Sequence, residues 1–471
     1  MQIKKIKNKY ISIITILIIG LYVFGTNQGH KFWKDDSKVI EWDVKSYYAY
    51  LPAAFIYHDL SFEFIDNNKD SVFLRNNIWP IKLDNGKYII KTTMGMSYMY
   101  LPAFFVANII AKPMGYKANG YSMPYKYTIT IFALIYLLIG IYYLRKLLLI
   151  LGFSEFAIFI TLVSIVAGTN LIFYSSYEPG MSHVYNFTLI NIFVYNTALW
   201  WNNKKIKNLI ILGLLGGLIS LIRPTNILIY ILFILWGVET KKDFIQRFKI
   251  FYTEFKITIL LVVLYIIPWL PQLIFWKIQT GHLLFFSYGE SGEQFFFKNP
   301  QIYNILFSYW KGWFVYTPLM FIASLGIFTL YKRIKWLTVL ISGFMLIVIY
   351  VLSSWWSWWF GGCYGNRAFI DFYGVMSILL ASLIMIFLKN KYLKYVIVIV
   401  ISLFIFHNNF QIRQYNSGAI NCFSMTKEMY WEQFLKIEKT DHYKTIIKVP
   451  DNDAAHNGVY RLINENNKDS N

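Results

Sequence analysis

The sequence contains few charged residues and almost no cysteine. Of its 471 residues, 15% are charged, against about 25% in an average soluble domain. Its two cysteines, Cys363 and Cys422, form no ligand cluster, and nothing specific favours a disulfide between them. The chain also lacks a phosphate-binding loop, a dinucleotide-binding glycine pattern and a zinc-type spacing of histidine and cysteine. These absences argue against a nucleotide-binding enzyme, a zinc protein and a disulfide-built scaffold.

Apolar runs recur along almost the whole chain instead. Hydrophobic residues make up 56% of the sequence, and the period-two alternation of a membrane β-barrel is absent. The composition therefore predicts an all-α polytopic membrane protein. The net charge of +20 does not indicate nucleic acid as a partner, because lysine and arginine cluster at the ends of the apolar runs, as the orientation rule for cytoplasmic loops predicts.

The lengths of the apolar runs predict about eleven membrane-spanning helices. Basic clusters fall between alternate pairs of runs, which favours a cytoplasmic N-terminus behind the lysines of residues 1–10. All the basic clusters lie on the cytoplasmic side only if the short apolar stretch 98–111 lies in the outer membrane surface and does not cross. This arrangement also requires that Pro224 divides 208–237 into two spans. The predicted spans are 11–26, 125–144, 155–174, 184–201, 208–222, 225–237, 256–276, 316–331, 336–353, 369–388 and 394–410.

This parity gives a simple domain plan. Residues 1–410 form the transmembrane domain, within which 27–124 make a long first extracytoplasmic loop with helices lying in the membrane plane. Residues 411–471 form a polar extracytoplasmic tail with an amphipathic piece at 425–435. Residues 277–311 form a later outer loop, which we interpret as a lid or acceptor-binding loop.

The first loop carries acids among aromatic residues. The stretch Glu-Trp-Asp-Val-Lys-Ser-Tyr-Tyr at 41–48 contains Asp43, and in a helix Asp43 and Tyr47 share a face. Tyr47, Tyr48 and the later Asp59 are candidates for substrate contacts. The alternative is that these acids are solvated loop residues. Glu41 and Asp43 only loosely resemble an acidic pair for a divalent metal, which needs more oxygen ligands, so we predict no cofactor.

Three cations are predicted to reach the same face of the membrane. Lys91 precedes the short apolar stretch, Arg223 sits in an apolar hairpin, and Arg367 stands at the mouth of a span. An arginine in such surroundings needs an anionic partner, and Lys91 could balance a phosphate. The competing interpretation of Lys91 is an interface anchor.

Two further polar or aromatic stretches are predicted on the outer face. Glu178 and His183 join two spans, where they are either a turn or substrate ligands. Trp355 and Trp356 begin a run of four tryptophans in five residues. Such a run is either an aromatic belt at the membrane boundary or an apolar platform for the face of a sugar.

Taken together, the chain resembles the GT-C superfamily of membrane glycosyltransferases, in particular the bacterial branch related to protein mannosyltransferases and to lipid A aminoarabinose transferase. The likeness lies in the order of one span, a long outer loop with an early acid, and many later spans. Asp43, in Trp42-Asp43-Val44-Lys45-Ser46, falls where the family has its catalytic aspartate. Lys91, followed by Pro102, looks like the family's Lys-Pro-Pro region, although the proline comes later here.

The resemblance implies an inverting glycosyltransferase of the bacterial cytoplasmic membrane. The donor would be a polyprenyl-phosphate-linked sugar and the acceptor a glycan, lipid or protein at the outer face. The lipid phosphate of the donor leaves as an anion, so no acid is needed to protonate it. One carboxylate is then enough, and Asp43 would be the general base. Two other functions stay open from the sequence: a transporter or flippase of lipid-linked sugars, and a polymerase-like ligase of surface polysaccharide.

Overall fold

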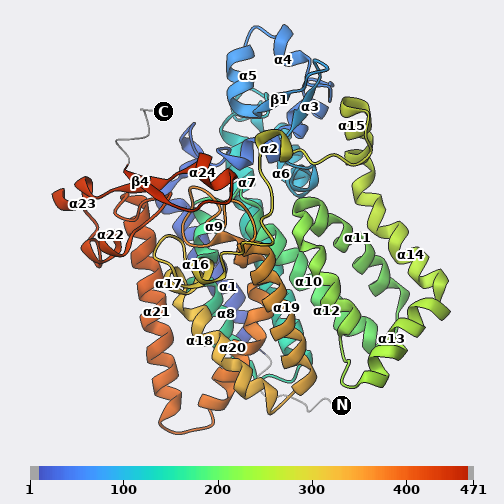
Figure 1. Ribbon diagram of the computed structural model, residues 1–471, viewed down its shortest axis with the longest axis vertical. Coiled ribbons are helices and arrows are strands. Elements are labelled where there is room, and N and C mark those ends of the chain that lie inside the picture. Colours follow the sequence, from blue (N-terminus) through green and yellow to red (C-terminus); the bar gives the residue numbers. More distant parts are fainter. Residues whose placement is uncertain (1–9, 465–471) are drawn as a thin grey trace. The chain divides into compact units, whose positions relative to one another are not determined.

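The computed structural model describes residues 10–464, which are mostly helical and include two short antiparallel sheets (Figure 1). Within these residues, six helices are long and apolar enough to cross a membrane. The all-α membrane class is thus supported, whereas the predicted count of about eleven spans is not confirmed. The lysines of residues 1–9, on which the predicted cytoplasmic N-terminus rests, lie outside the described part. The six helices are Ile11–Lys34, Met123–Ile150, Phe255–Thr280, Lys335–Ser353, Arg367–Phe387 and Leu393–Asn416.

Several other predicted spans form helices that are shorter than a full crossing. These are Glu155–Ala167, Ile206–Ile222, Pro224–Leu235 and Pro318–Tyr331. The stretch 98–111, which was predicted to lie in the membrane surface rather than to span, falls in the short apolar helix Gly95–Ala111. The predicted break at Arg223 is present, because the preceding helix ends at Ile222 and Arg223 adopts an extended conformation with φ −142° and ψ 107°. Pro224, which cannot continue the helical hydrogen-bond ladder, then begins a 3-10 turn.

The chain divides into two compact units, which are described in turn. The first comprises residues 17–147 and 174–291, and the second comprises the remaining described residues. Helices α1 (Ile11–His30), α7 (Met123–Ile150) and α9 (Leu171–Ser176) each contribute residues to both units.

The first unit contains the long outer loop and a group of apolar helices. In the loop the elements are η1 (Phe32–Lys34), α2 (Asp43–Tyr48), α3 (Tyr50–Phe55), α4 (Phe64–Asn67), α5 (Ser71–Ile78), β1 (Pro80–Lys82), β2 (Tyr88–Ile90) and α6 (Gly95–Ala111). The later elements are α10 (Ser182–Asn203), α11 (Ile206–Ile222), η2 (Pro224–Leu228), α12 (Ile229–Leu235), α13 (Lys241–Thr253), α14 (Phe255–Ile266), η3 (Ile267–Trp269), α15 (Leu270–Thr280) and η4 (Gly289–Ser291). Helix α11 packs against both α10 and α14 (Figure 1).

The loop of the first unit has its own apolar core. Tyr50, Phe62, Ile90 and Met94 are buried there together with Phe275 of α15. Burial of aromatic side chains removes a large apolar area from water, so this core fixes the short helices that could not persist alone. The long loop is therefore an ordered subdomain rather than a simple connector.

The second unit is built around α20 (Tyr373–Phe387), whose span is mostly buried beneath α18 (Pro318–Tyr331) and α8 (Glu155–Ala167). The C-terminal segment folds around Met429 and Tyr430, which are buried. The predicted amphipathic piece corresponds to α22 (Lys427–Glu432), and the predicted boundary at residue 411 falls inside α21 (Leu393–Asn416). The other elements are α16 (Ile302–Phe307), α17 (Trp313–Tyr316), α19 (Lys335–Ser353), η5 (Arg367–Phe372), α21 (Leu393–Asn416), α23 (Asp441–Thr445), β3 (Lys448–Pro450), α24 (Asn452–His456) and β4 (Leu462–Asn464).

Candidate functional site

Asp43 is the first residue of the short helix α2. Its neighbour Trp42 has φ 48° and ψ −132°, a backbone conformation that residues other than glycine rarely adopt. The amide of Lys45 donates to the Trp42 carbonyl over 3.0 Å, which starts the helix. Val44 and Tyr48 are buried while Asp43 is half-buried. Strain of this kind persists where the surroundings hold it, and here it lies directly beside the candidate acid.

The start of α6 brings α2 and α11 together. The Ser97 hydroxyl donates to the Tyr47 carbonyl of α2, and the Thr93 hydroxyl donates to the Leu221 carbonyl of α11. A Cβ added at Gly95 would lie 2.6 Å from the Ile222 backbone nitrogen. The absence of a side chain at this position therefore allows α6 to approach the helix end that precedes Arg223.

The Glu178 turn packs against the same region. A Cβ at Gly180 would lie 2.7 Å from both the Val39 carbonyl oxygen and the Val44 side chain. The buried Tyr100 hydroxyl of α6 donates to the Gly180 carbonyl. The backbones that carry Glu178 and Asp43 are thus in direct contact through this glycine.

His183 follows the turn as the second residue of α10. Its ring is buried and lies edge-on to Tyr174, with 4.9 Å between the ring centroids. Glu178 is half-buried, and its carbonyl accepts from the Met181 amide over 3.1 Å. Their predicted role as substrate ligands stays a prediction.

Lys91 is positioned by the hairpin of β1 and β2. The hairpin turns at Gly86, whose φ of 81° suits glycine, and Lys91 directly follows β2. The Lys91 carbonyl accepts from the Ser287 hydroxyl over 2.5 Å, and its ammonium lies 5.3 Å from the Tyr288 ring centroid. Part of the predicted acceptor loop therefore contacts Lys91.

The acids and tyrosines of this region differ in their electrostatic surroundings. Burial raises the pKa of the Glu41 carboxyl, although Lys38 lies 3.6 Å away and opposes the shift. Burial also raises the pKa of Tyr48, which is fully enclosed and donates to the Gly120 carbonyl over 2.6 Å. The Tyr48 hydroxyl is thus engaged within the protein, and its predicted substrate contact stays a prediction.

Asp59 is held within the loop by hydrogen bonds to the segment that leads into α4. Its carboxylate accepts from the Ser61 amide at 2.7 Å, the Ser61 hydroxyl at 2.6 Å and the Phe64 amide at 3.0 Å. Burial raises the pKa of Asp59, but these hydrogen bonds outweigh burial, and the pKa lies below its ordinary value. These contacts explain how Asp59 fixes the start of α4.

Replacing Asp59 by alanine is expected to destabilise this part of the loop by about 1 kcal/mol, the usual net contribution of an intramolecular hydrogen bond. Because the folded pKa is depressed, the contribution of Asp59 is present above the unfolded pKa near 3.8 and is lost as the pH falls through the folded value. Hydrogen exchange of the amides at 59–66 measures both effects. Glu63→Ala, at a neighbouring exposed carboxylate, is the matched control, and equal effects of the two substitutions would refute the assignment.

The tryptophan run lies in the second unit and divides into two parts. Trp358 and Trp359 are buried against Trp310, whose ring centroid lies 4.6 Å from that of Trp359. Trp355 and Trp356 are half-buried, with Trp355 4.7 Å from the Phe295 ring. The later two tryptophans are thus core residues, and only the first two remain candidates for a sugar platform.

Arg367 also belongs to the second unit, at the start of η5, where it is half-buried. It lies four residues after Cys363, which is buried, and neither Cys363 nor Cys422 forms a disulfide. The Cys363 amide donates to the Cys422 carbonyl over 2.9 Å, so the two segments pair through their backbones. The predicted phosphate contact of Arg367 stays a prediction.

Sequence reasoning overlooked an exposed aromatic pair beside Asp43. Trp42 is 61% exposed, and its ring lies 6.4 Å from that of Trp79, a residue in the left-handed region with φ 55°. Lys45 lies 5.1 Å above the Trp79 ring and donates to the Asn76 carbonyl. Backbone conformation has no reliable signal in sequence at a tryptophan, which explains the omission.

Residues 10–464 contain no group of three or more histidine, cysteine, aspartate and glutamate side chains that could hold a metal ion. No protein-family model, curated protein or solved structure matches the chain. The functional interpretation therefore depends on the residues of the site and on the resemblance described above.

Proposed function

We propose that the chain is an integral-membrane glycosyltransferase that moves a sugar from a polyprenyl-phosphate donor to an acceptor at the outer face of the bacterial cytoplasmic membrane. One observation carries the proposal: the start of α6 and the residues just before it contact both α2, which begins at Asp43, and the end of α11, next to Arg223. Lys91 lies two residues before Thr93 in the same stretch. An acid and two cations from distant parts of the sequence thus lie on adjoining backbone segments.

This set of groups suits displacement of a lipid phosphate. The acceptor oxygen attacks the anomeric carbon, its proton passes to the Asp43 carboxylate, and the bond to the phosphate oxygen breaks with its electron pair. The leaving phosphate carries negative charge, which Lys91 and Arg223 would stabilise. A single attack inverts the anomeric centre. A hydrolytic glycosidase would instead require two facing carboxylates.

The distribution of charge along α10 supports an outer-face location for the proposed site. The helix begins next to His183 and ends before Lys204, whose ammonium lies 3.7 Å from the Trp201 ring centroid. Arg247 of α13 stacks on the same indole, with 3.3 Å between its Cζ and the ring centroid. Lys204, which is part of a basic cluster predicted to be cytoplasmic, and the helix that begins at the predicted cytoplasmic pair Lys241-Lys242 therefore meet at the end of α10 opposite His183.

The direct test supplies the purified protein in lipid vesicles with a polyprenyl-phosphate sugar that is labelled in the sugar. If the protein transfers the sugar, free polyprenyl phosphate is released and the label moves to a second molecule. Both products are followed by mass spectrometry. Movement of intact donor between leaflets without release would favour a flippase. Binding of neither donor nor free polyprenyl phosphate would refute both functions.

Replacing Arg223 by glutamine is expected to raise KM for the donor by about tenfold to a hundredfold, since a hydrogen bond to a charged group contributes about 1.5–3 kcal/mol. Arg223→Lys is expected to recover part of the loss, because it keeps the charge but not the bidentate geometry. The measurement is the initial rate as a function of donor concentration. Arg413→Gln, at an exposed arginine of α21, is the control. An unchanged KM in Arg223→Gln would remove Arg223 from the site.

A further inference from the structure

Helix α13 is fixed by one face only. A capping box holds its first turn, because the Thr240 hydroxyl accepts from the Asp243 amide and the Asp243 carboxylate accepts from the Thr240 amide. Arg247 is its one buried side chain; besides stacking on Trp201, it donates to the Trp236 carbonyl over 2.8 Å. These contacts anchor the helix on the ends of α10 and α12.

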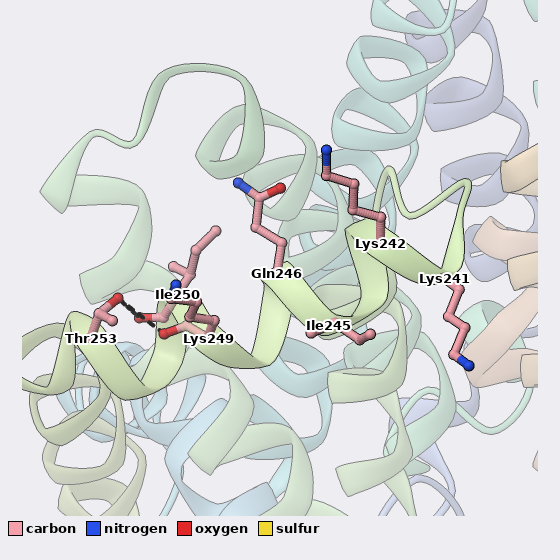
Figure 2. A pocket seen from close by; sticks show the side chains of 7 residues that line it. All are labelled: Lys241, Lys242, Ile245, Gln246, Lys249, Ile250 and Thr253. Carbon is pink, nitrogen blue, oxygen red and sulfur yellow. Dashed lines mark hydrogen bonds between the residues drawn. The ribbon is translucent and has the colours of Figure 1, made fainter.

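The remaining surface of α13 carries two parallel stripes. Phe244, Phe248 and Tyr252 recur every four residues and are 44%, 50% and 85% exposed, so they form one apolar stripe. Beside it lies a polar stripe, of which Lys242 and Gln246 project to the same side of the helix (Figure 2). Lys241, Lys242, Gln246, Lys249 and Thr253, together with Ile245 and Ile250, line an open pocket of about 820 Å³.

The lysines of this pocket have no acidic partner within the described residues. Asp243 is the one acid of α13, and its carboxylate is engaged by Thr240 at the cap; these hydrogen bonds lower the pKa of Asp243. Among residues 10–464, no ion pair involves Lys241, Lys242 or Lys249. Three positive charges therefore lie along one short helix, and none of them forms an ion pair with a described acid.

The position of α13 indicates which anion these lysines would bind. The helix leads through Glu254 directly into α14, which begins a candidate membrane span and exposes apolar side chains such as Ile259 and Val262. An exposed apolar stripe beside a basic stripe, at the start of a span, is the arrangement of a helix that lies in the membrane surface. Lysines at that depth attract anionic lipids.

We propose that α13 is a binding site for anionic phospholipid headgroups, with Lys241, Lys242 and Lys249 supplying the positive charge and Phe244, Phe248 and Tyr252 embedded at the boundary with the acyl chains. The site is independent of the proposed sugar transfer. By the predicted orientation it faces the cytoplasmic leaflet, which is the more anionic one.

The test uses the full chain and compares wild type with Lys241→Gln/Lys242→Gln/Lys249→Gln. Binding of phosphatidylglycerol and of phosphatidylcholine is measured by native mass spectrometry and by retention in lipid nanodiscs. Each lysine contributes about fivefold to binding of an anionic surface, so the triple variant is expected to bind phosphatidylglycerol about a hundredfold more weakly. Binding of phosphatidylcholine should be unchanged, and added salt should weaken wild-type binding.

The matched control is Lys69→Gln/Lys298→Gln/Lys427→Gln, which removes the same charge at three exposed lysines outside α13. It should bind phosphatidylglycerol as wild type does. The site is refuted if the α13 variant keeps wild-type binding, or if the control loses as much, since the effect would then reflect net charge alone. Thermal unfolding of each variant shows whether a loss of lipid comes from misfolding.

Discussion

Asp43→Asn is expected to lower the rate of sugar transfer by about 10²–10⁴-fold, which is the usual contribution of a positioned general base. Asparagine is close in size to aspartate and is equally compatible with the first turn of a helix, so α2 should keep its place between α6 and the Glu178 turn. The amide cannot accept the proton of the acceptor hydroxyl. The loss should therefore appear in kcat at saturating donor, with little change in KM for the donor.

Glu41→Gln is the matched control for this substitution. Glu41 lies two residues before Asp43 and carries the same charge, but its carboxylate lies 3.6 Å from Lys38. It is expected to retain most of the activity. Full transfer by Asp43→Asn would exclude Asp43 as the base, and an equal loss in both variants would indicate a general effect of charge or folding in this loop.

The helices of the chain could largely be predicted from hydropathy, but their breaks could not all be. Pro224 predicted the break between α11 and η2, because proline removes a backbone hydrogen-bond donor. The predicted span 256–276 corresponds to the candidate span Phe255–Thr280, within which a 3-10 turn containing Pro268 separates α14 from α15. The break between α8 and α9 at residues 168–170 has no proline, and it depends on tertiary packing.

The hairpin of β1 and β2 was missed although it has a local signal. Asn85-Gly86 is a dipeptide that favours tight hairpin turns, and the flanking residues pair as Ile81 with Ile89. The hairpin matters because it places Lys91 at the start of the stretch that leads into α6. A turn signal inside a mainly helical membrane protein deserves the same weight as elsewhere.

The meeting of segments at α6 could not have been predicted from a single sequence. Ser97 and Tyr47 are 50 residues apart, and Thr93 and Leu221 are 128 apart. Neither hydrogen bond follows from periodicity or composition, because a serine or threonine in an apolar helix more often bonds to its own backbone. Sequence reasoning could name the polar residues of the outer face but not which of them adjoin.

Gly95→Ala is expected to impair both the stability and the activity of the first unit. The new methyl group would lie 2.6 Å from the nitrogen and 2.8 Å from the Cα of Ile222. Both are backbone atoms, which cannot rotate away as a side chain can. Overpacking of this kind costs about 1–3 kcal/mol, so a lowered midpoint of thermal unfolding should accompany the change.

The same displacement should separate Lys91 and Thr93 from the turn at Arg223. A misplacement of about 1 Å at a reacting centre can reduce a rate by about 10²-fold, so transfer should fall even at temperatures where the variant is folded. Gly25→Ala is the control, because a Cβ at Gly25 in α1 meets no atom within 4 Å and alanine is a better helix former. A Gly95→Ala protein with wild-type activity and stability would show that the close approach of α6 to α11 is not needed, which would remove the contact that links Lys91 to Arg223.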